Sequence, residues 1–393
     1  MNQAAAISRE DWLERAVALA PAIAAAADEI ERERRIPAAL LERMLEAQLF
    51  RLLLPRPFGG GEVDPLTFVA VIEEIAKHDA STAWVLCQTA VCAMSGAYMP
   101  AATVAEIFGD ERTIAAWGAG FGGKAVPVEG GYRLNGKWLF ASGGRHATWF
   151  GGHSLICDDS GTPQRTDKGA PLTRTLFFPA DAVTMSDVWH VTGLRGTGSD
   201  AYEVSDLFVS AARSFRRDDP ADRQYHAPLY HLKTDTMFSA GFASLALGLA
   251  RAMLDALRGL ALEKTPRGYA NPLRNSPAFQ SEFGELEAQL RAARAYLMGT
   301  LAGVWESVRE TGALGLEQRF SMRLAATHTI GEARAVANAA YHHAGATAIF
   351  ASNPFERRLR DMNAVAQQIQ ARRSHFETVG KHLLGLEADM SSL

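Results

Sequence analysis

The chain has 393 residues, which is enough for two to three domains at about 150 residues per domain. It carries 40 Lys and Arg against 44 Asp and Glu, a net charge of −4, which argues against a nucleic-acid binder because such proteins usually show a basic surplus. With 48% hydrophobic and 21% charged residues the composition excludes a mostly disordered chain, and a core of this size needs no disulfide or metal.

The first part of the chain shows the periodicity of helices. Ser8, followed by Asp11 three residues later, forms a capping box that predicts a helix start. Pro37 is placed to begin a second helix, since proline is favoured at a first helical position. We predict helices over residues 8–30, 37–49, 64–77 and 80–98, in an N-terminal all-α domain of residues 1–109.

The middle of the chain changes to the alternation typical of strands. Val126, Val128, Tyr132 and Leu134 alternate about a Glu-Gly-Gly turn at 129–131, which predicts a β-hairpin. Aromatic and β-branched residues stay frequent to about residue 215. We therefore predict a central β domain, a barrel or a sandwich, over residues 110–229.

The remainder of the chain is helical again, in segments joined by short connections. Such connections favour antiparallel neighbours and hence an up-and-down four-helix bundle. The most apolar stretch, 238–262, contains Arg251, Asp255 and Arg258, so we expect a packed helix and no membrane span. The predicted helices are 233–263, 277–311, 316–344 and 354–371, in a C-terminal domain of residues 230–393, and the fold class is α+β.

The histidines and cysteines of the sequence do not favour a metal site, and no motif of a catalytic serine nucleophile is present. His342 and His343 are adjacent, and neighbours on a helix point about 100° apart, so they cannot easily share an ion. Cys87, Cys92 and Cys157 show no Cys-x-x-Cys spacing, and no Gly-x-Ser-x-Gly elbow occurs. We expect no metal site, no disulfide framework and a reducing, cytoplasmic location.

Two stretches could bind a polar or flat ligand. In 193–199 (GLRGTGS) the backbone amides and the hydroxyls of Thr197 and Ser199 could hold polar groups, although a turn that connects two strands is the simpler interpretation of this motif taken alone. In 138–144 (WLFASGG) two aromatic residues and the Ser142 hydroxyl could form a wall and a donor for a flat heterocycle. The alternative there is a core strand that ends in a turn.

Four segments occur in a recognisable order: 79–84 (DASTAW), 136–143 (GKWLFASG), 189–199 (WHVTGLRGTGS) and 354–361 (PFERRLRD). Together with the α–β–α layout they resemble the acyl-CoA dehydrogenase superfamily across nearly the full chain. The resemblance is closest to the oxygenase branch, the two-component (group D) flavin-dependent monooxygenases. It implies a homotetramer with packed C-terminal bundles, and reduced FMN or FAD supplied by a separate flavin reductase.

The resemblance also implies a reaction. Reduced flavin and O2 would form a C4a-hydroperoxide, which would hydroxylate or epoxidise a small aromatic substrate, indole-like or phenolic. An FAD-dependent acyl-CoA dehydrogenase is the alternative, and a non-catalytic flavin-binding relative is a second one.

The position that separates these alternatives holds Gln368. Dehydrogenases of the superfamily typically carry a glutamate just after the Arg-Asp pair that here ends at Asp361, and this neighbourhood has no carboxylate. The oxygenase branch often has a histidine seven residues after that Asp, where this chain has Gln368, and Asn363 stands where another histidine is frequent. A Gln can donate a hydrogen bond but cannot act as a base. Other candidates for a base are His78, His146 and His375.

By the same resemblance, Ser142 and Gln368 would be the catalytic residues, with Ser142 the hydrogen-bond partner of flavin N5. Arg267 and Arg274 would bind the flavin phosphate, often that of a neighbouring subunit, because a guanidinium fork suits phosphate. The other flavin contacts would be Trp138, Phe140, Arg195, Thr197, Gly198 and Ser199. The substrate-binding residues would be Trp84, Gln88 and Cys92.

Overall fold

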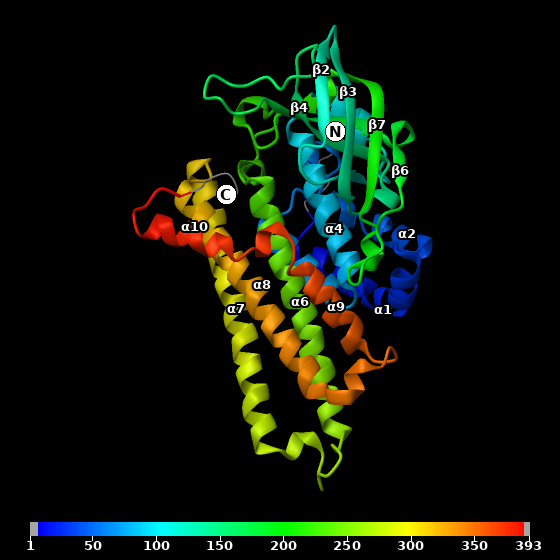
Figure 1. Cartoon of the computed structure of the whole chain (residues 1–393), viewed down its shortest axis with the longest axis vertical. Coiled ribbons are helices and arrows are strands. Elements are labelled where there is room, and N and C mark those ends of the chain that lie inside the picture. The colour runs from blue at the N-terminus through cyan, green and yellow to red at the C-terminus, as the bar shows by residue number, and fades with distance from the viewer. Residues whose placement is uncertain (1–6, 389–393) are drawn as a thin grey trace.

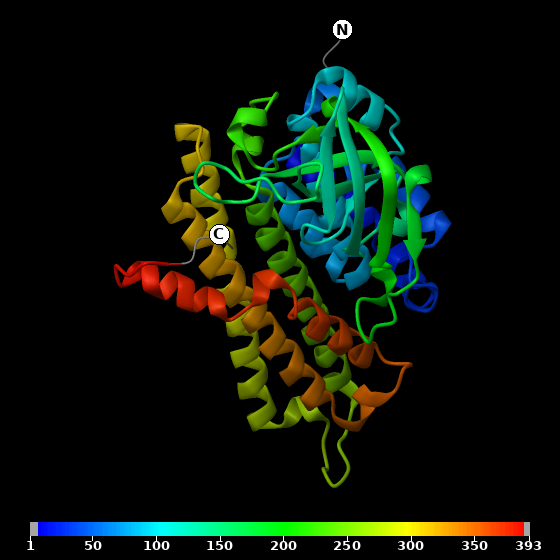
Figure 2. The ribbon, with the colours of Figure 1, turned by 45° about the horizontal axis from the view of Figure 1, so that its top comes forward.

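The computed structural model of the protein describes residues 7–388. Residues 1–6 and 389–393, which fall in the predicted first and third domains, lie outside the described residues. The N-terminal helices and the sheet form one end of the molecule, and the long C-terminal helices extend away from them (Figure 1). Figure 2 shows the curved sheet lying against the N-terminal helices.

The N-terminal helices largely follow the predicted pattern. The capping box is present, since Ser8 Oγ accepts from the Asp11 amide while the Asp11 carboxylate accepts from the Ser8 amide. The helix predicted to reach residue 98 ends earlier, because a 3₁₀ turn (Met94–Ala97) follows it, and a short helix after Pro100 was not predicted. The helices are α1 (Arg9–Glu33), α2 (Ala38–Glu46), α3 (Pro65–Ala76), α4 (Ala80–Ala93) and α5 (Ala101–Phe108).

The central strands form one mixed sheet of eight strands in the order β6-β7-β3-β2-β4-β5-β8, with β1 paired to β4. The predicted hairpin is present, as Val128 pairs with Gly131 across the turn between β2 and β3. The strands are β1 (Ala115–Trp117), β2 (Gly123–Val128), β3 (Gly131–Ala141), β4 (Trp149–Ile156), β5 (Thr173–Pro179), β6 (Thr184–Ser186), β7 (Asp200–Ser210) and β8 (Ser214–Phe215).

The C-terminal helices are α6 (Thr234–Glu263), α7 (Pro277–Thr311), α8 (Leu316–Ala344), α9 (Pro354–Val365) and α10 (Ser374–Leu383). By length and composition α6 could cross a membrane, yet 94% of its most apolar window is buried inside the protein, as in a core helix. The predicted helix 354–371 ends at Val365, so Gln368 begins a 3₁₀ turn, Ile369–Ala371, and does not lie on a helix.

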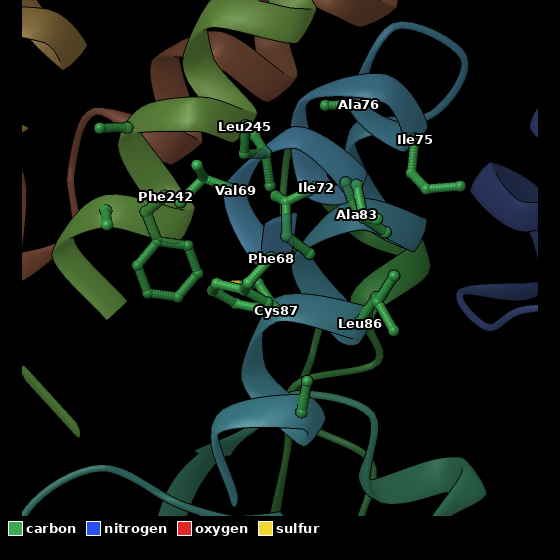
Figure 3. Packing of buried hydrophobic residues seen from close by; sticks show 14 of the residues in the cluster. Phe68, Val69, Ile72, Ile75, Ala76, Ala83, Leu86, Cys87, Phe242 and Leu245 are labelled. Carbon is green, nitrogen blue, oxygen red and sulfur yellow. The ribbon is translucent and has the colours of Figure 1, made fainter. Parts of the chain in front are cut away.

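Close packing of α6 fixes the position of α4. Side chains of α3, α4 and α6 interdigitate, among them Phe68, Cys87 and Phe242 (Figure 3). A Cβ added to Gly241 would lie 2.5 Å from Cys87 Sγ, and one added to Gly248 would lie 2.2 Å from a backbone oxygen of α3. Glycine at these two positions therefore allows α6 to touch α4 at Gly241 and α3 at Gly248.

Candidate active site

Four polar side chains from three separate segments meet in one hydrogen-bonded row. Trp84 Nε1, on α4, donates to Ser142 Oγ at 3.0 Å, just past the end of β3. Ser142 Oγ lies 2.7 Å from Ser199 Oγ, which lies 2.7 Å from Thr197 Oγ1. The Thr197 hydroxyl donates to the Leu194 carbonyl oxygen at 2.9 Å. We call Trp84, Ser142, Ser199 and Thr197 the hydroxyl relay.

The relay has a fixed polarity, because each hydroxyl owns a single hydrogen. The Thr197 hydroxyl donates its hydrogen to the Leu194 carbonyl oxygen and can therefore only accept from Ser199. Ser199 thus donates to Thr197, and Ser142 must in turn donate to Ser199. Ser142 Oγ also accepts from the indole of Trp84. Its remaining capacity is one lone pair, and Ser142 therefore presents an acceptor to any group placed beside it.

The accessible face of α4 is narrow. Every residue of the helix is buried except Trp84 and Gln88, which lie one turn apart at i and i+4 and so share a face. Trp84 stacks on Phe242 of α6, with ring centroids 4.1 Å apart. Cys92, one turn further on, is fully buried, and burial raises the pKa of its thiol. Trp84 and Gln88 are thus the residues of α4 that a ligand can reach, whereas Cys92, which was predicted to contact the substrate, is fully buried.

The end of β3 differs from the expected arrangement. Trp138 is only 1% exposed: its ring stacks on Tyr202 at 5.0 Å, and its Nε1 donates to the His153 carbonyl at 2.8 Å. The ring therefore offers no free face to a cofactor, contrary to the expected wall. The register shift between Trp138 and Ala141 is a bulge, where Phe140 has φ +63°. It leaves the consecutive residues Leu139 and Phe140 exposed by 49% and 55%.

The 193–199 loop is attached to α9 on its other side. Asp361 Oδ1 accepts from the Leu194 amide at 2.6 Å. A Cβ added to Gly193 would lie 2.2 Å from the Arg360 carbonyl oxygen, so the two backbones touch. Burial, together with the negative charge of Asp79, raises the pKa of Asp361 to about 7. Through its hydrogen bond with the Leu194 amide, the Asp361 carboxyl group anchors the loop that supplies Thr197 and Ser199.

Gln368 is half-buried as a residue, and its side-chain amide is unusual. Both its Oε1 and Nε2 are buried, and neither has a hydrogen-bond partner among the described residues. Buried amides are nearly always paired, because an unpaired one costs about 1–3 kcal/mol. Two unpaired atoms on one amide are what a site for a polar ligand group would contain.

The three histidines considered as bases are engaged elsewhere. His78 Nε2 contacts Glu74 at 3.3 Å, His146 Nε2 accepts from the Ile36 amide at 3.1 Å, and His375 Nε2 donates to the Ile369 carbonyl at 2.6 Å. Burial lowers the pKa of His146 to about 4 and also lowers the pKa of His375. None of the three hydrogen-bonds with the relay in the part of the chain that the structure describes.

The predicted cationic contacts fall in two places. Arg195 adjoins the relay loop, where its Nε lies 3.9 Å from Glu31 and is buried without a hydrogen-bond partner within residues 7–388. Arg267 and Arg274 are exposed in the loop between α6 and α7, at the end of the bundle away from the sheet (Figure 1). A single chain therefore does not bring these two arginines to Ser142.

Among residues 7–388, no three His, Cys, Asp or Glu side chains are grouped so that they could hold a metal ion. The groups that the structure brings together are the relay and the exposed apolar pair at the bulge, with Arg195 in the same loop as Thr197; the side chain of Gln368 makes no hydrogen bond to any of them within residues 7–388. A flat heterocycle with polar edges would fit this set.

Family models identify the fold at both ends of the chain. The acyl-CoA dehydrogenase N-terminal domain matches residues 13–101, and the acyl-CoA dehydrogenase C-terminal domain matches residues 240–373. The chain belongs to the acyl-CoA dehydrogenase superfamily. Its α–β–α order is the arrangement that the resemblance of the four sequence segments implied.

Similar proteins within this superfamily are oxygenases. Indole-3-acetate monooxygenase from Pseudomonas putida is 29% identical over 86% of this chain and 85% of its own length. The oxygenase component of an FADH2-dependent resorcinol hydroxylase from Rhizobium is 28% identical over 95% of this chain and 94% of its own. The crystal structure of 3-HSA hydroxylase from Rhodococcus superposes with a TM-score of 0.88, at 25% identity, over 98% of this chain and 99% of that one.

Proposed function

We propose that this chain is the oxygenase component of a two-component flavin-dependent monooxygenase, which hydroxylates or epoxidises a small indole-like or phenolic ring. The observation that supports the proposal is the direction of the hydrogen bonds in the hydroxyl relay, together with the similarity of this chain to the oxygenases from Pseudomonas putida and Rhizobium. Reduced flavin bears a hydrogen on N5, and Ser142 Oγ has an acceptor site to offer it. When bound, reduced FMN or FAD supplies the electrons that activate O2 for transfer of one oxygen atom.

The chain's own residues would hold and shield the flavin. Ser142 accepts the N5 hydrogen and keeps it in place through Ser199 and Thr197, while the exposed bulge residues Leu139 and Phe140 cover the ring system and exclude water. Arg195 offers an unused guanidinium donor beside the relay loop. The loop itself, with Gly198 at φ +50°, is held by Asp361.

The substrate would lie on the accessible face of α4. Trp84, stacked on Phe242, offers an aromatic floor, and Gln88 lies one turn away from it. The unpaired amide of Gln368 would hold a polar group of the substrate or donate to the oxygen being transferred. Because an amide cannot remove a proton from carbon, this residue also argues against the acyl-CoA dehydrogenase alternative.

A homotetramer in the cytoplasm completes the proposal. Arg267 and Arg274 lie too far along the bundle to serve their own chain, so a neighbouring subunit would deliver them to the flavin phosphate. A separate flavin reductase would supply the reduced cofactor, since the Rhizobium relative is named as the oxygenase component of an FADH2-dependent hydroxylase.

The test is an oxygenation assay with isotope labelling. The protein is mixed without oxygen with FMNH2 or FADH2 and with indole, phenol or indole-3-acetate, and then exposed to ¹⁸O2. We expect one ¹⁸O atom in the aromatic product. Release of all electrons as hydrogen peroxide with every ring tested would contradict the proposal. Bleaching of bound FAD by an acyl-CoA would favour the dehydrogenase, and no tight flavin binding at all would exclude both enzymes.

A further inference from the structure

A cavity of about 300 Å³ lies among residues that the proposed function does not use. Its wall is formed by the first turn of α1, the loop before α3, the start of α3, residues 228–229 and one side chain of α7, Trp305. This volume is at the lower end of the range that is typical of small-molecule sites. The cavity opens at the protein surface, because Arg9 and Arg56 in its wall are exposed.

The length of α1 separates this cavity from the hydroxyl relay. Trp12, near the start of the helix, lines the cavity, whereas Ile30, near its end, packs on the relay loop, where a Cβ added to Gly196 would lie 2.1 Å from Ile30 Cγ2. The two residues are 18 positions apart, which corresponds to about 27 Å of helix at about 1.5 Å per residue. A ribityl chain holds a flavin phosphate much closer to the ring than this, so the cavity is distinct from the proposed cofactor site.

One buried donor in the cavity wall is unused. Trp12 is 2% exposed, and its indole Nε1 is buried without a hydrogen-bond partner within residues 7–388. Cζ2, on the nitrogen side of the ring, lies against Gly61 of the same wall, where an added Cβ would be 2.7 Å away. A buried indole N–H usually has a partner, because an unpaired donor is costly. Trp12 therefore indicates a ligand that accepts a hydrogen bond.

The charged groups of the wall also favour an acceptor. Asp64 caps α3, since its Oδ1 accepts from the Thr67 amide at 2.9 Å and its Oδ2 from the Thr67 hydroxyl at 2.6 Å. Glu62 Oε2 accepts from the Arg56 amide at 2.9 Å. The guanidinium groups of Arg9 and Arg56, by contrast, form no hydrogen bond or ion pair in the part of the chain that the structure describes. The capacity left for a ligand is therefore mainly that of donors.

Two helix N-termini add positive potential. The helix α1 begins at Arg9 and α3 at Pro65, and both first turns border the cavity. The capping box pairs Ser8 with the Asp11 amide and leaves the amides of the first two helical residues without an intrahelical acceptor. Helix N-termini attract phosphate and other anions. Donors supplied by two different segments suit a phosphate, whose oxygens point in several directions, better than a carboxylate, whose two oxygens lie in one plane.

We propose that this cavity binds a phosphate group, free or as a small monoester, at a site separate from the flavin and the aromatic substrate. Trp12 Nε1 and the guanidinium groups of Arg9 and Arg56 bind the phosphate oxygens. Trp305, which is half-buried in the wall, contacts the remainder of an ester. The inference does not depend on the proposed oxygenase function, because none of these residues belongs to the relay or to the accessible face of α4.

Isothermal titration calorimetry of the full chain, in a buffer free of phosphate, tests the site with inorganic phosphate, glycerol 3-phosphate and acetate. We expect saturable binding of phosphate and weaker binding of acetate. Arg56→Gln should raise the phosphate Kd about 10-fold, because it removes a charge-assisted hydrogen bond, and Trp12→Phe about 5-fold, because it removes a neutral one. Tighter binding of glycerol 3-phosphate would identify an ester as the ligand, and tighter binding of inorganic phosphate would identify the free ion.

Two control variants locate the bound phosphate. Arg165→Gln removes an exposed arginine of the β4–β5 loop, and Arg267→Gln removes one from the proposed flavin-phosphate site. Both should bind phosphate as the wild type does. Arg56→Gln alters an exposed side chain, and its melting temperature shows that it is folded. Absence of phosphate binding by the wild type, equal affinity for acetate, or an unchanged Kd in Arg56→Gln overturns the inference. A Kd raised only by Arg267→Gln also overturns it, because the phosphate then binds at the flavin site.

Discussion

The Ser142 hydroxyl has one hydrogen, and the hydrogen bonds of the relay direct it to Ser199 Oγ. As long as Ser199 receives it, Ser142 can only accept at flavin N5, which suits reduced flavin and disfavours oxidised flavin. The relay therefore predicts a site that prefers the reduced cofactor, and the preference depends on Ser199, a residue that need not touch the flavin.

Replacing Ser199 tests this polarity. In Ser199→Ala the Ser142 hydrogen is free to donate to N5 of oxidised flavin, so the ratio of the dissociation constants for oxidised and reduced FMN should fall about 10-fold, the equivalent of about 1.4 kcal/mol. Fluorescence titration with FMN, and anaerobic titration with FMNH2, measure the two constants. A ratio equal to that of the wild type would show that Ser142 does not face N5.

Ser244 provides the matched control. It is a fully buried serine of α6 whose hydroxyl has no partner among the described residues. Ser244→Ala removes the same atom from a similar environment without breaking a hydrogen bond, and we expect an unchanged ratio and an unchanged or slightly higher free energy of unfolding.

At the scale of elements, α9 controls the relay loop through Asp361. The pKa of Asp361 is about 7 in the folded protein and lower in the unfolded chain, so between these values the folded state binds the extra proton. The contribution of this carboxyl group to stability is therefore present at low pH and is lost as the pH rises through 7.

Asp361→Asn removes that titration and keeps an oxygen that can accept from the Leu194 amide. We expect the melting temperature of the variant, relative to the wild type, to rise between pH 5 and pH 8. Thermal melts at several pH values measure the difference. Asp28→Asn, which alters an exposed surface pair with Arg357, should change the melting temperature little. A relative melting temperature of Asp361→Asn that does not vary with pH would contradict the assignment.

The contact between the loop and α9 has no room for a side chain. Gly193→Ala would place its Cβ against the Arg360 carbonyl oxygen, so we expect a loss of about 2–4 kcal/mol in the free energy of unfolding and weaker flavin binding. Gly259→Ala on α6, where a Cβ would meet nothing within 4 Å, should instead stabilise the protein by about 0.5–1 kcal/mol. Denaturant unfolding of both variants measures the difference, and equal effects would refute this account of Gly193.

The sequence predicted elements better than it predicted contacts. The two long helices α7 and α8 have the predicted bounds, because their apolar periodicity is long and their ends carry clear signals. Trp138 was misplaced, since alternation puts residues 138 and 140 on one face and the bulge between them breaks that alternation. The polarity of the relay depends on three segments distant in sequence, and no local pattern contains it.

At the scale of the whole molecule, flavin binding is proposed to involve the end of the bundle away from the sheet. Arg267 and Arg274 are exposed there, on the loop between α6 and α7 (Figure 1). If a neighbouring subunit delivers them to the flavin phosphate, Arg267→Gln should raise the dissociation constant for reduced FMN about 10-fold without changing the oligomer.

Flavin titration and sedimentation velocity on the same samples check this prediction. Arg165→Gln, which alters an exposed loop of the sheet, should leave both quantities as in the wild type. An unchanged dissociation constant in Arg267→Gln, with the oligomer intact, would remove this arginine from the cofactor site.

The way α4 is packed has a consequence for how this enzyme can acquire new substrates. All its side chains except those of Trp84 and Gln88 are locked into the protein interior. Substitutions in α4 that do not disturb the protein interior are therefore restricted to these two positions, and Trp84 donates a hydrogen bond to Ser142 of the relay. Gln88 is left as the position of α4 where evolution, or a designed library, can reshape the substrate range at little cost to folding.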